Sequence, residues 1–312
     1  MNYEYQEFSF PSSDGKNTIH AELYIPKGEI RGIVTLSHGM IDYVGRYGLL
    51  AEYLTGHGYI FAGNDHLGHG KTAARPEDLG YFAERDGYLR AIDDLRLMNE
   101  HLHRRYPDLP LILFGHSMGS FLARLYAERH PETIDALIIH GTGGKNPLLP
   151  FGKAVISLVK LFKGERYRSK LVTDIAFGSY NDHYDKSEGE NAWLTRELER
   201  VAGRSSDPYT SFIFTASAYQ DLFNMIGLSN SKGHFDSFPK DMPTLVVSGS
   251  EDPVGDYGRG VKFVYDSLCA SGVKNVELKI YDGARHELFN ETNREEVFAD
   301  LVNWLDRTAF AK

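Results

Sequence analysis

The sequence predicts an α/β protein built on a mostly parallel sheet of eight strands with helices on both faces. Short apolar runs rich in β-branched residues alternate with longer amphipathic stretches, which is typical of a chain that repeats strand, helix and strand. The apolar runs contain few polar residues, as expected of parallel strands that are buried on both faces. A chain of 312 residues, 42% of them hydrophobic and 25% charged, can bury a large core.

Hydrophobic periodicity and turn residues define the individual elements. The first two strands are expected to pair antiparallel at the edge of the sheet, because residues 12–15 have the composition of a tight turn. Expected strands cover residues 5–10, 19–25, 31–37, 59–64, 110–115, 135–140, 243–249 and 276–281. Expected helices cover residues 43–56, 86–105, 118–130, 257–270 and 293–308.

The pattern changes in the second third of the chain, where strands disappear, aromatic residues become frequent and turn residues separate short helical segments. We expect residues 145–239 to form a helical cap inserted between strand 135–140 and strand 243–249. Residues 1–144 and 240–312 then form the catalytic core. An insertion at this point lies over the carboxyl ends of the parallel strands, where ligands bind.

A Gly-His-Ser-Met-Gly sequence stands where one buried strand is expected to give way to a helix. A nucleophile at such a turn adopts a strained backbone conformation, and the turn has no room for side chains two positions before or after it. Gly115 and Gly119 fit that requirement. Because a bare G-x-S-x-G occurs by chance, Ser117 is a candidate nucleophile only if an acid and a histidine follow it at later strand ends.

Both partners follow in the required chain order. Asp252 comes just after strand 243–249, and His286 comes in the loop after strand 276–281. Side chains from several strand ends can converge on one crevice of an open parallel sheet. We therefore expect His286 to take the proton of Ser117 during attack on a carbonyl carbon, and Asp252 to orient the imidazole.

Three neighbouring carboxylates are alternatives to Asp252: Glu251, Asp256 and Asp282. Asp282 is the strongest of them, because it stands only four residues before His286. Chain order and position at a strand end favour Asp252.

The tetrahedral intermediate of acyl transfer also needs an oxyanion hole. One backbone N–H is expected from Met118, the residue after the nucleophile, and the second from Met40 after strand 31–37. The alternative reading of His38-Gly39 is a simple tight turn.

Five segments together resemble the α/β-hydrolases of the monoacylglycerol lipase and lysophospholipase group, and the resemblance runs along nearly the whole chain. They are residues 37–40, 65–70, 115–119, 250–252 and 285–286. The resemblance implies the α/β-hydrolase fold, a serine esterase activity, an acyl-ester substrate and a cap before the acid-bearing strand. It assigns the nucleophile, acid and base to Ser117, Asp252 and His286. The motif residues that support this assignment are His38, Gly39, Gly115, His116 and Gly119.

A second cluster of polar residues has the ligand types of a zinc site, since Asp65, His66 and His69 stand close together in sequence. In the resembled family this stretch shapes the loop beside the active site, so we expect neither a metal nor a cofactor. The single cysteine, Cys269, excludes an intramolecular disulfide and is expected to be packed against its helix's neighbours.

Composition also limits the partners and the location. A net charge of −9 argues against nucleic acid as a partner. The first residues lack a basic start and an apolar segment, and no stretch approaches the ~20 apolar residues of a membrane span. We expect a soluble, cytoplasmic protein with a small-molecule ester substrate.

One part of the expected cap is amphipathic and basic. Residues 151–170 combine an apolar face with six Lys or Arg residues against one acidic residue. Such a helix either makes transient contact with an anionic membrane surface or packs its apolar face onto the catalytic domain.

The sequence therefore predicts a carboxylic-ester hydrolase acting on monoacylglycerol- or lysophospholipid-like esters. A short-chain or aryl esterase, such as one for hydroxycinnamoyl esters, would use the same three residues. A ligand-binding protein on the same fold is a third possibility. A peptidase stays open, whereas dehalogenase and epoxide-hydrolase chemistry is disfavoured because related enzymes have a carboxylate where this chain has Ser117.

Overall fold

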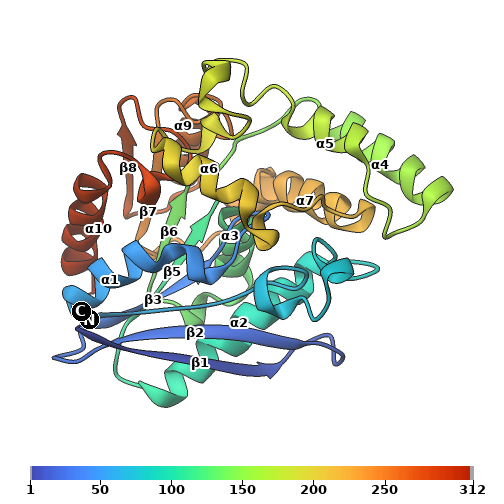
Figure 1. Ribbon diagram of the computed structural model, residues 1–312. Helices are drawn as coiled ribbons and strands as arrows, with labels where there is room; N and C mark the ends of the chain where they lie inside the picture. Colours follow the sequence, from blue (N-terminus) through green and yellow to red (C-terminus); the bar gives the residue numbers. More distant parts are fainter. Residues whose placement is uncertain (1, 310–312) are drawn as a thin grey trace.

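The computed structural model describes residues 2–309 and contains one eight-stranded sheet with the order β1-β2-β4-β3-β5-β6-β7-β8 (Figure 1). The strands are β1 (Tyr3–Pro11), β2 (Thr18–Pro26), β3 (Gly32–Ser37), β4 (Tyr59–Asn64), β5 (Leu111–His116), β6 (Ala136–His140), β7 (Thr244–Gly249) and β8 (Val276–Tyr281). β1 pairs antiparallel with β2, and β2 antiparallel with β4. All pairs from β4 to β8 are parallel, so the predicted fold class is confirmed.

Helices cover both faces of this sheet. The core helices are α1 (Gly48–Gly56), α2 (Gly87–Arg105), α3 (Met118–Arg129), α9 (Arg259–Ala270) and α10 (Arg294–Ala309). Successive strand residues point to opposite faces. Ile33 accordingly joins the apolar cluster under α2, α3 and α9, whereas Val34 joins the cluster under α1 and α10.

The segment between β6 and β7 is helical. It contains α4 (Leu149–Lys163), α5 (Lys170–Phe177), α6 (Leu198–Ser206), α7 (Ala216–Ser229) and α8 (Lys232–Ser237). Within the described residues its β-structure is a single isolated bridge between Arg168 and Thr215. We call residues 145–239 the cap. Figure 1 shows α4 to α7 gathered beyond one end of the sheet.

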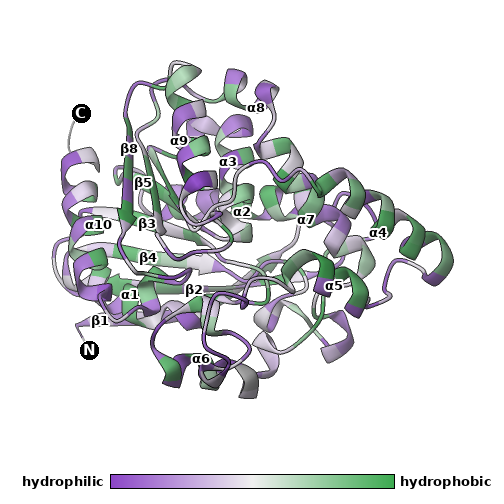
Figure 2. Cartoon of the chain, turned by 90° about the horizontal axis from the view of Figure 1, so that it is seen from above, coloured by the Kyte–Doolittle hydropathy of each residue, from purple (hydrophilic) through white to green (hydrophobic). Residues whose placement is uncertain are grey.

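The two outermost cap helices leave much of their apolar surface uncovered. Figure 2 shows α4 and α5 projecting at one end of the molecule with extensive hydrophobic colouring. The buried residues of α4 are Gly152 and Ile156, whereas Phe162 has 77% of its surface exposed. Among the described helices, none is long and apolar enough to cross a bilayer.

Two local expectations were wrong. The helix expected from residue 43 begins instead with a 3-10 turn, Val44–Tyr47, and becomes α-helical at Gly48. Cys269 is exposed rather than packed. The buried face of α9 passes through Leu268, and the next residue lies about 100° further round the helix and points to solvent.

Candidate active site

Ser117 stands at the turn between β5 and α3 with a positive φ of 53° and a ψ of −120°. That conformation is strained for a residue with a side chain. Two glycines make the turn possible. A Cβ on Gly115 would lie 2.6 Å from Cβ of Ala123, and one on Gly119 would collide with the carbonyl oxygen of Ser37. The sequence prediction of a sharp, glycine-dependent elbow thus agrees with the backbone.

His286 and Asp252 meet at the carboxyl ends of the last two strands. His286 Nδ1 donates to Asp252 Oδ2 over 2.9 Å, and the exposed fractions of the two residues are 1% and 0%. Asp252 also accepts from Ser248 Oγ at 3.1 Å and from the Val254 N–H at 2.9 Å. Because Nδ1 of His286 carries the proton, Nε2 of the neutral ring is left as a proton acceptor.

The rival carboxylates have other surroundings. Asp282 is exposed and accepts from Ser250 Oγ at 3.4 Å, and Asp256 pairs with Arg259 at 2.6 Å. Glu251 is exposed. The structure thus brings Asp252, among the four candidates, into hydrogen-bond contact with His286.

In the loop after β3, two hydrogen bonds of His38 fix the orientation of the peptide between Gly39 and Met40, beside Ser117. The His66 N–H donates to His38 Nε2 at 2.9 Å, so His38 must carry its proton on Nδ1, which donates to the carbonyl of Gly39 at 2.8 Å. In a trans peptide the N–H of Met40 points away from that carbonyl. A Cβ on Gly39 would lie 3.3 Å from Ser117 Cβ, so this loop runs close to the candidate nucleophile.

Met118 is the first residue of α3. The first N–H groups of a helix have no intrahelical acceptor, and they lie at the positive end of its dipole. Both expected oxyanion donors, Met40 and Met118, are therefore backbone N–H groups beside Ser117.

A buried cluster of four charges lies next to these groups. Arg46 contacts Asp42 Oδ1 at 2.8 Å and Glu287 Oε2 at 2.9 Å. Arg204 of α6 contacts Glu287 Oε1 at 3.4 Å. Burial raises the pKa of both acids, but the positive charges of the two guanidinium groups, above all that of Arg46, lower it by more. The pKa of Asp42 therefore falls to about 2, and the pKa of Glu287 is also lowered.

One cavity of about 1030 Å³ is bordered by Ser117, by His286 and by three members of the charged cluster, Asp42, Glu287 and Arg204. The loop after β3 contributes Gly39 and Met40 to the same lining. The cap supplies apolar walls that include Phe177, Trp193, Phe212, Leu222 and Ile226, and Phe121 of α3 adds to them from the core. A cavity of this size and character suits an apolar small molecule.

The family of the chain follows from a comparison with protein-family models. Residues 28–293 match the model described as serine aminopeptidase, S33. This chain belongs to the serine aminopeptidase S33 family. The matched region includes Ser117, Asp252 and His286, and the recognition of an α/β-hydrolase of the monoacylglycerol lipase-like group is confirmed.

Several relatives of this S33 family member match along almost its whole length. The monoacylglycerol lipase of Mycolicibacterium smegmatis is 26% identical over 307 residues, covering 96% of this chain and 96% of that protein. The human monoglyceride lipase is 26% identical, covering 92% of this chain and 86% of that protein. A thermostable carboxyl esterase from Bacillus coagulans, solved in complex with glycerol, is 29% identical with a TM-score of 0.91, covering 98% and 99%. These relatives support the prediction of a carboxylic-ester hydrolase.

The histidine-rich loop after β4 is held by internal hydrogen bonds. The two oxygens of Asp65 accept from the N–H groups of Val44 at 2.9 Å and Lys71 at 2.8 Å. His66 Nε2 lies 3.1 Å from Ser37 Oγ, and burial lowers the pKa of His69 to about 3. These contacts order the loop beneath the oxyanion segment. The expectation that this loop binds no metal stays a prediction.

Residues 192–194 of the cap contact the loop of the candidate base His286, although the sequence had not singled out this segment. The ring centroid of Trp193 lies 5.1 Å from that of His286, and the Glu287 N–H donates to the carbonyl of Leu194 at 2.7 Å. Arg285 Nη1 donates to the carbonyl of Ala192 at 2.8 Å. The only sequence signal for these contacts was the aromatic richness of the cap.

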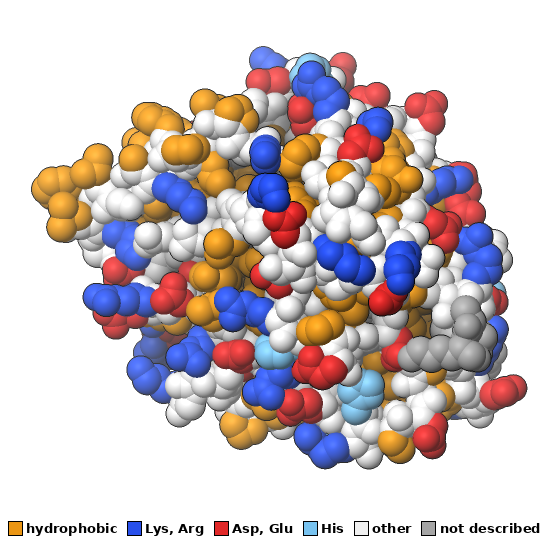
Figure 3. Space-filling model, turned by 180° about the vertical axis from the view of Figure 1, so that it is seen from behind, with side chains coloured by type: hydrophobic (Ala, Val, Ile, Leu, Met, Phe, Trp, Pro, Cys, Tyr) orange, Lys and Arg blue, Asp and Glu red, His pale blue; other side chains and the backbone are white. Residues whose placement is uncertain are grey.

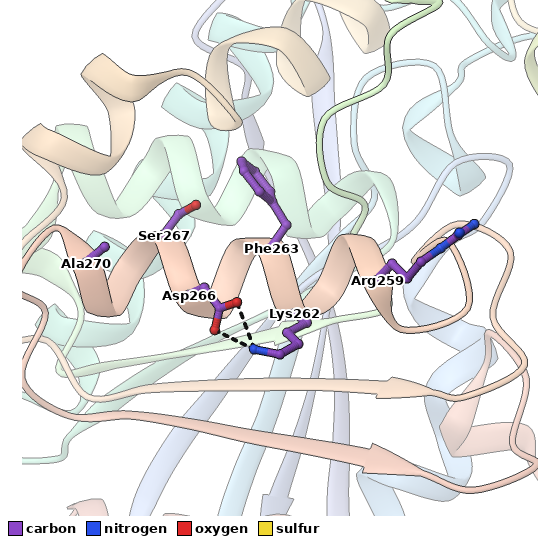
Figure 4. Close-up of a pocket in the computed structure, with 6 residues that line it drawn as sticks. All are labelled: Arg259, Lys262, Phe263, Asp266, Ser267 and Ala270. Atoms are coloured by element: carbon purple, nitrogen blue, oxygen red, sulfur yellow. Dashed lines mark hydrogen bonds and ion pairs between the residues drawn. The ribbon is translucent and has the colours of Figure 1, made fainter.

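A second, open depression of about 490 Å³ lies along α9 (Figure 4). It is bordered by Phe263 and by the ion pair of Lys262 with Asp266, whose N–O distance is 2.8 Å. None of the residues that border it belongs to the Ser117 site.

Proposed function

We propose that this protein is a serine carboxylic-ester hydrolase that acts through Ser117, His286 and Asp252. The observation that carries the proposal is the 2.9 Å hydrogen bond from His286 Nδ1 to the buried Asp252, in a cavity that His286 and Ser117 both border. This arrangement leaves Nε2 of His286 as the base for the Ser117 hydroxyl.

The steps of the reaction follow from these positions. Ser117 Oγ attacks the ester carbonyl carbon while His286 Nε2 takes its proton, and the developing oxyanion accepts hydrogen bonds from the N–H groups of Met40 and Met118. Collapse of the intermediate expels the alcohol, which receives the proton from His286. Water then attacks the acyl-enzyme with His286 again as base, releasing the carboxylic acid and restoring Ser117. Asp252 stabilises the imidazolium form in each half-reaction.

The proposed substrates are monoacylglycerol- or lysophospholipid-like esters. The apolar cap walls favour a fatty acyl group, and the cavity volume of about 1030 Å³ accommodates an acyl chain with a small alcohol. The monoacylglycerol lipase and the phospholipase of Bacillus subtilis among the relatives favour lipid esters. We infer that residues 145–239 act as the cap over this cavity.

The proposal includes transient contact of this cap with an anionic membrane surface. The most exposed apolar residues of α4 are Leu161 and Phe162, at 75% and 77%, and Lys163 follows them directly. Figure 3 shows apolar side chains gathered at this projecting end of the molecule, with Lys and Arg side chains nearby. An apolar surface with basic neighbours favours insertion at the boundary between headgroups and acyl chains. In the alternative, α4 packs its apolar face onto the catalytic domain. The burial of Gly152 and Ile156 supports that packing, and the exposure of Leu161 and Phe162 supports membrane contact.

The test is a kcat/KM series for purified protein with para-nitrophenyl esters from acetyl to palmitoyl, together with Ser117→Ala. The proposal expects a Ser117-dependent rise toward medium or long chains, and matching activity on monoacylglycerol or lysophospholipid in micelles. Activity confined to acetyl or aryl esters would instead favour a short-chain or hydroxycinnamoyl-type esterase. Tight binding without multiple turnover would favour a ligand-binding protein, and cleavage of amino-terminal peptide bonds a peptidase.

A further inference from the structure

We propose that Arg204, carried by cap helix α6, is a positioning residue that holds the oxyanion loop and the segment after His286 together. The inference rests on the proposed ester hydrolysis at Ser117. It adds a role for the cap beyond enclosing the substrate. The argument depends on two contacts made by one guanidinium group.

The first contact is with the oxyanion loop. Arg204 Nη2 donates to the carbonyl of Ile41 at 2.8 Å, one residue beyond the proposed oxyanion donor Met40. Ile41 has a φ of 54°, which a β-branched residue adopts only when its surroundings hold it there. The strained loop therefore needs an external contact, and Arg204 supplies one at its carbonyl.

The second contact is with the loop that carries the base. Arg204 Nη1 lies 3.4 Å from Glu287 Oε1, and Glu287 directly follows His286. Glu287 is also bound by Arg46 at 2.9 Å and accepts from Asn290 Nδ2 at 2.7 Å. One cap side chain thus links the neighbour of an oxyanion donor to the neighbour of the base.

The cluster is balanced in charge. Two guanidinium groups, Arg46 and Arg204, face two carboxylates, Asp42 and Glu287, and the side chain of Arg204 is only 11% exposed. Loss of the Arg204 charge leaves one buried negative charge in excess near His286. A nearby negative charge favours the imidazolium form, so the acidic limb of the pH profile moves to higher pH.

Other groups that face His286 stay the same in such a variant. Asp252 accepts from Nδ1, the His116 ring centroid lies 4.8 Å from that of His286, and Trp193 packs on it from the cap. His116 is in turn hydrogen-bonded to His140, with an Nδ1–Nδ1 distance of 2.6 Å. Burial lowers the pKa of both histidines, which keeps them neutral in the pH range of the assay. A shift of the acidic limb of the pH profile therefore reports the missing Arg204 charge.

The experiment compares Arg204→Met, Arg204→Lys and the control Arg200→Met, which alters an exposed arginine of the same helix. Active enzyme is counted by titration with a fluorophosphonate. Arg204→Met should lower kcat by about 10- to 100-fold with little change in KM, the size expected when catalytic groups are misplaced by a fraction of an ångström. The acidic limb of its pH profile should move to higher pH. Arg204→Lys should keep this limb at the wild-type pH and regain only part of kcat. Arg200→Met should match the wild type.

A second readout does not depend on activity. Amide hydrogen exchange should accelerate in residues 39–44 and 286–290 of Arg204→Met and not of Arg200→Met. If Arg204→Met unfolds, Arg204→Lys and the charge-balanced Arg204→Met/Glu287→Gln replace it in both measurements.

The outcomes separate this inference from the proposed function. Unchanged kcat and unchanged exchange in the Arg204 variants would overturn it while ester hydrolysis stands. A rise in KM alone would make Arg204 a substrate contact and also overturn it. If the wild type hydrolyses no ester but amide exchange is accelerated in Arg204→Met, the positioning role stands and the proposed reaction is rejected.

Discussion

The indole ring of Trp193 packs against the imidazole ring of His286, with 5.1 Å between the ring centroids and an interplanar angle of 38°. The contact joins a cap residue to the proposed base. Tyr180 makes an edge contact with the indole at a centroid distance of 5.2 Å, so the cap holds Trp193 in place. The wall of the cavity therefore also limits the rotation of the base.

Trp193→Ala should lower kcat about tenfold, because a base that samples other orientations is less often aligned with its nucleophile. Trp193→Phe keeps an aromatic face and should retain most of kcat. Steady-state kinetics with a medium-chain para-nitrophenyl ester checks the pair. Equal activity of Trp193→Ala and the wild type would show that the indole does not orient His286.

Ser117→Gly should abolish turnover and raise the free energy of unfolding by about 1 kcal/mol relative to Ser117→Ala, because glycine adopts a positive φ without strain. The φ of 53° at this position motivates the comparison. Urea denaturation of the two inactive variants gives the difference. A less stable glycine variant would mean that the elbow stores no strain at this residue.

Asp252→Asn should lower kcat by about four orders of magnitude, because an amide can hold His286 in the wrong tautomer. Asp282→Asn is the matched control, since Asp282 is exposed and, within the described structure, makes no hydrogen bond to His286. Both variants should give a native circular dichroism spectrum. A large loss in Asp282→Asn, with Asp252→Asn active, would reassign the acid.

Gly39→Val should lower kcat by about 100-fold through displacement of the Met40 N–H, since loss of one oxyanion donor has an effect of that order. A Cβ at Gly39 would lie 3.1 Å from His116 Cδ2 and 3.3 Å from Ser117 Cβ, so the loop must shift. Gly28→Val is the control, because a Cβ there meets nothing within 4 Å. If Gly39→Val keeps full kcat, Met40 is not an oxyanion donor.

The projecting end of α4 should bind anionic vesicles at low salt, and added salt should weaken the binding by screening the lysines. The double variant Leu161→Ser/Phe162→Ser removes the two most exposed apolar side chains and should lose most of the binding. Leu228→Ser, at an exposed leucine of α7, should bind like the wild type. Co-sedimentation with phosphatidylglycerol vesicles measures all three, and absence of wild-type binding would reject membrane contact.

Much of the fold could be predicted because its signals are local. β3 is buried at all six positions, and its apolar run Ile33–Leu36 is broken only by Thr35, so its environment can be deduced from neighbouring residues. The elbow motif is equally local, since Gly115, Ser117 and Gly119 lie within five residues, although the need for glycine at 119 also comes from the Ser37 carbonyl of β3. The division of the chain at residues 144 and 240 also rests on local composition and stays a prediction.

The remaining features depend on contacts between residues far apart in the chain. Asp252, Asp256 and Asp282 are chemically alike. Chain order favoured Asp252, but its hydrogen bond to His286 is visible only in the folded chain. The sequence likewise gave no sign that Arg204 reaches Ile41, because the two are 163 residues apart and their contact depends on how the cap packs on the core. Sequence by itself determined the strands, the order of the candidate triad and the nucleophile turn, since these follow from periodicity and local sterics. Tertiary structure alone decided which cap residues and which charges surround His286, because those relationships exist only after packing.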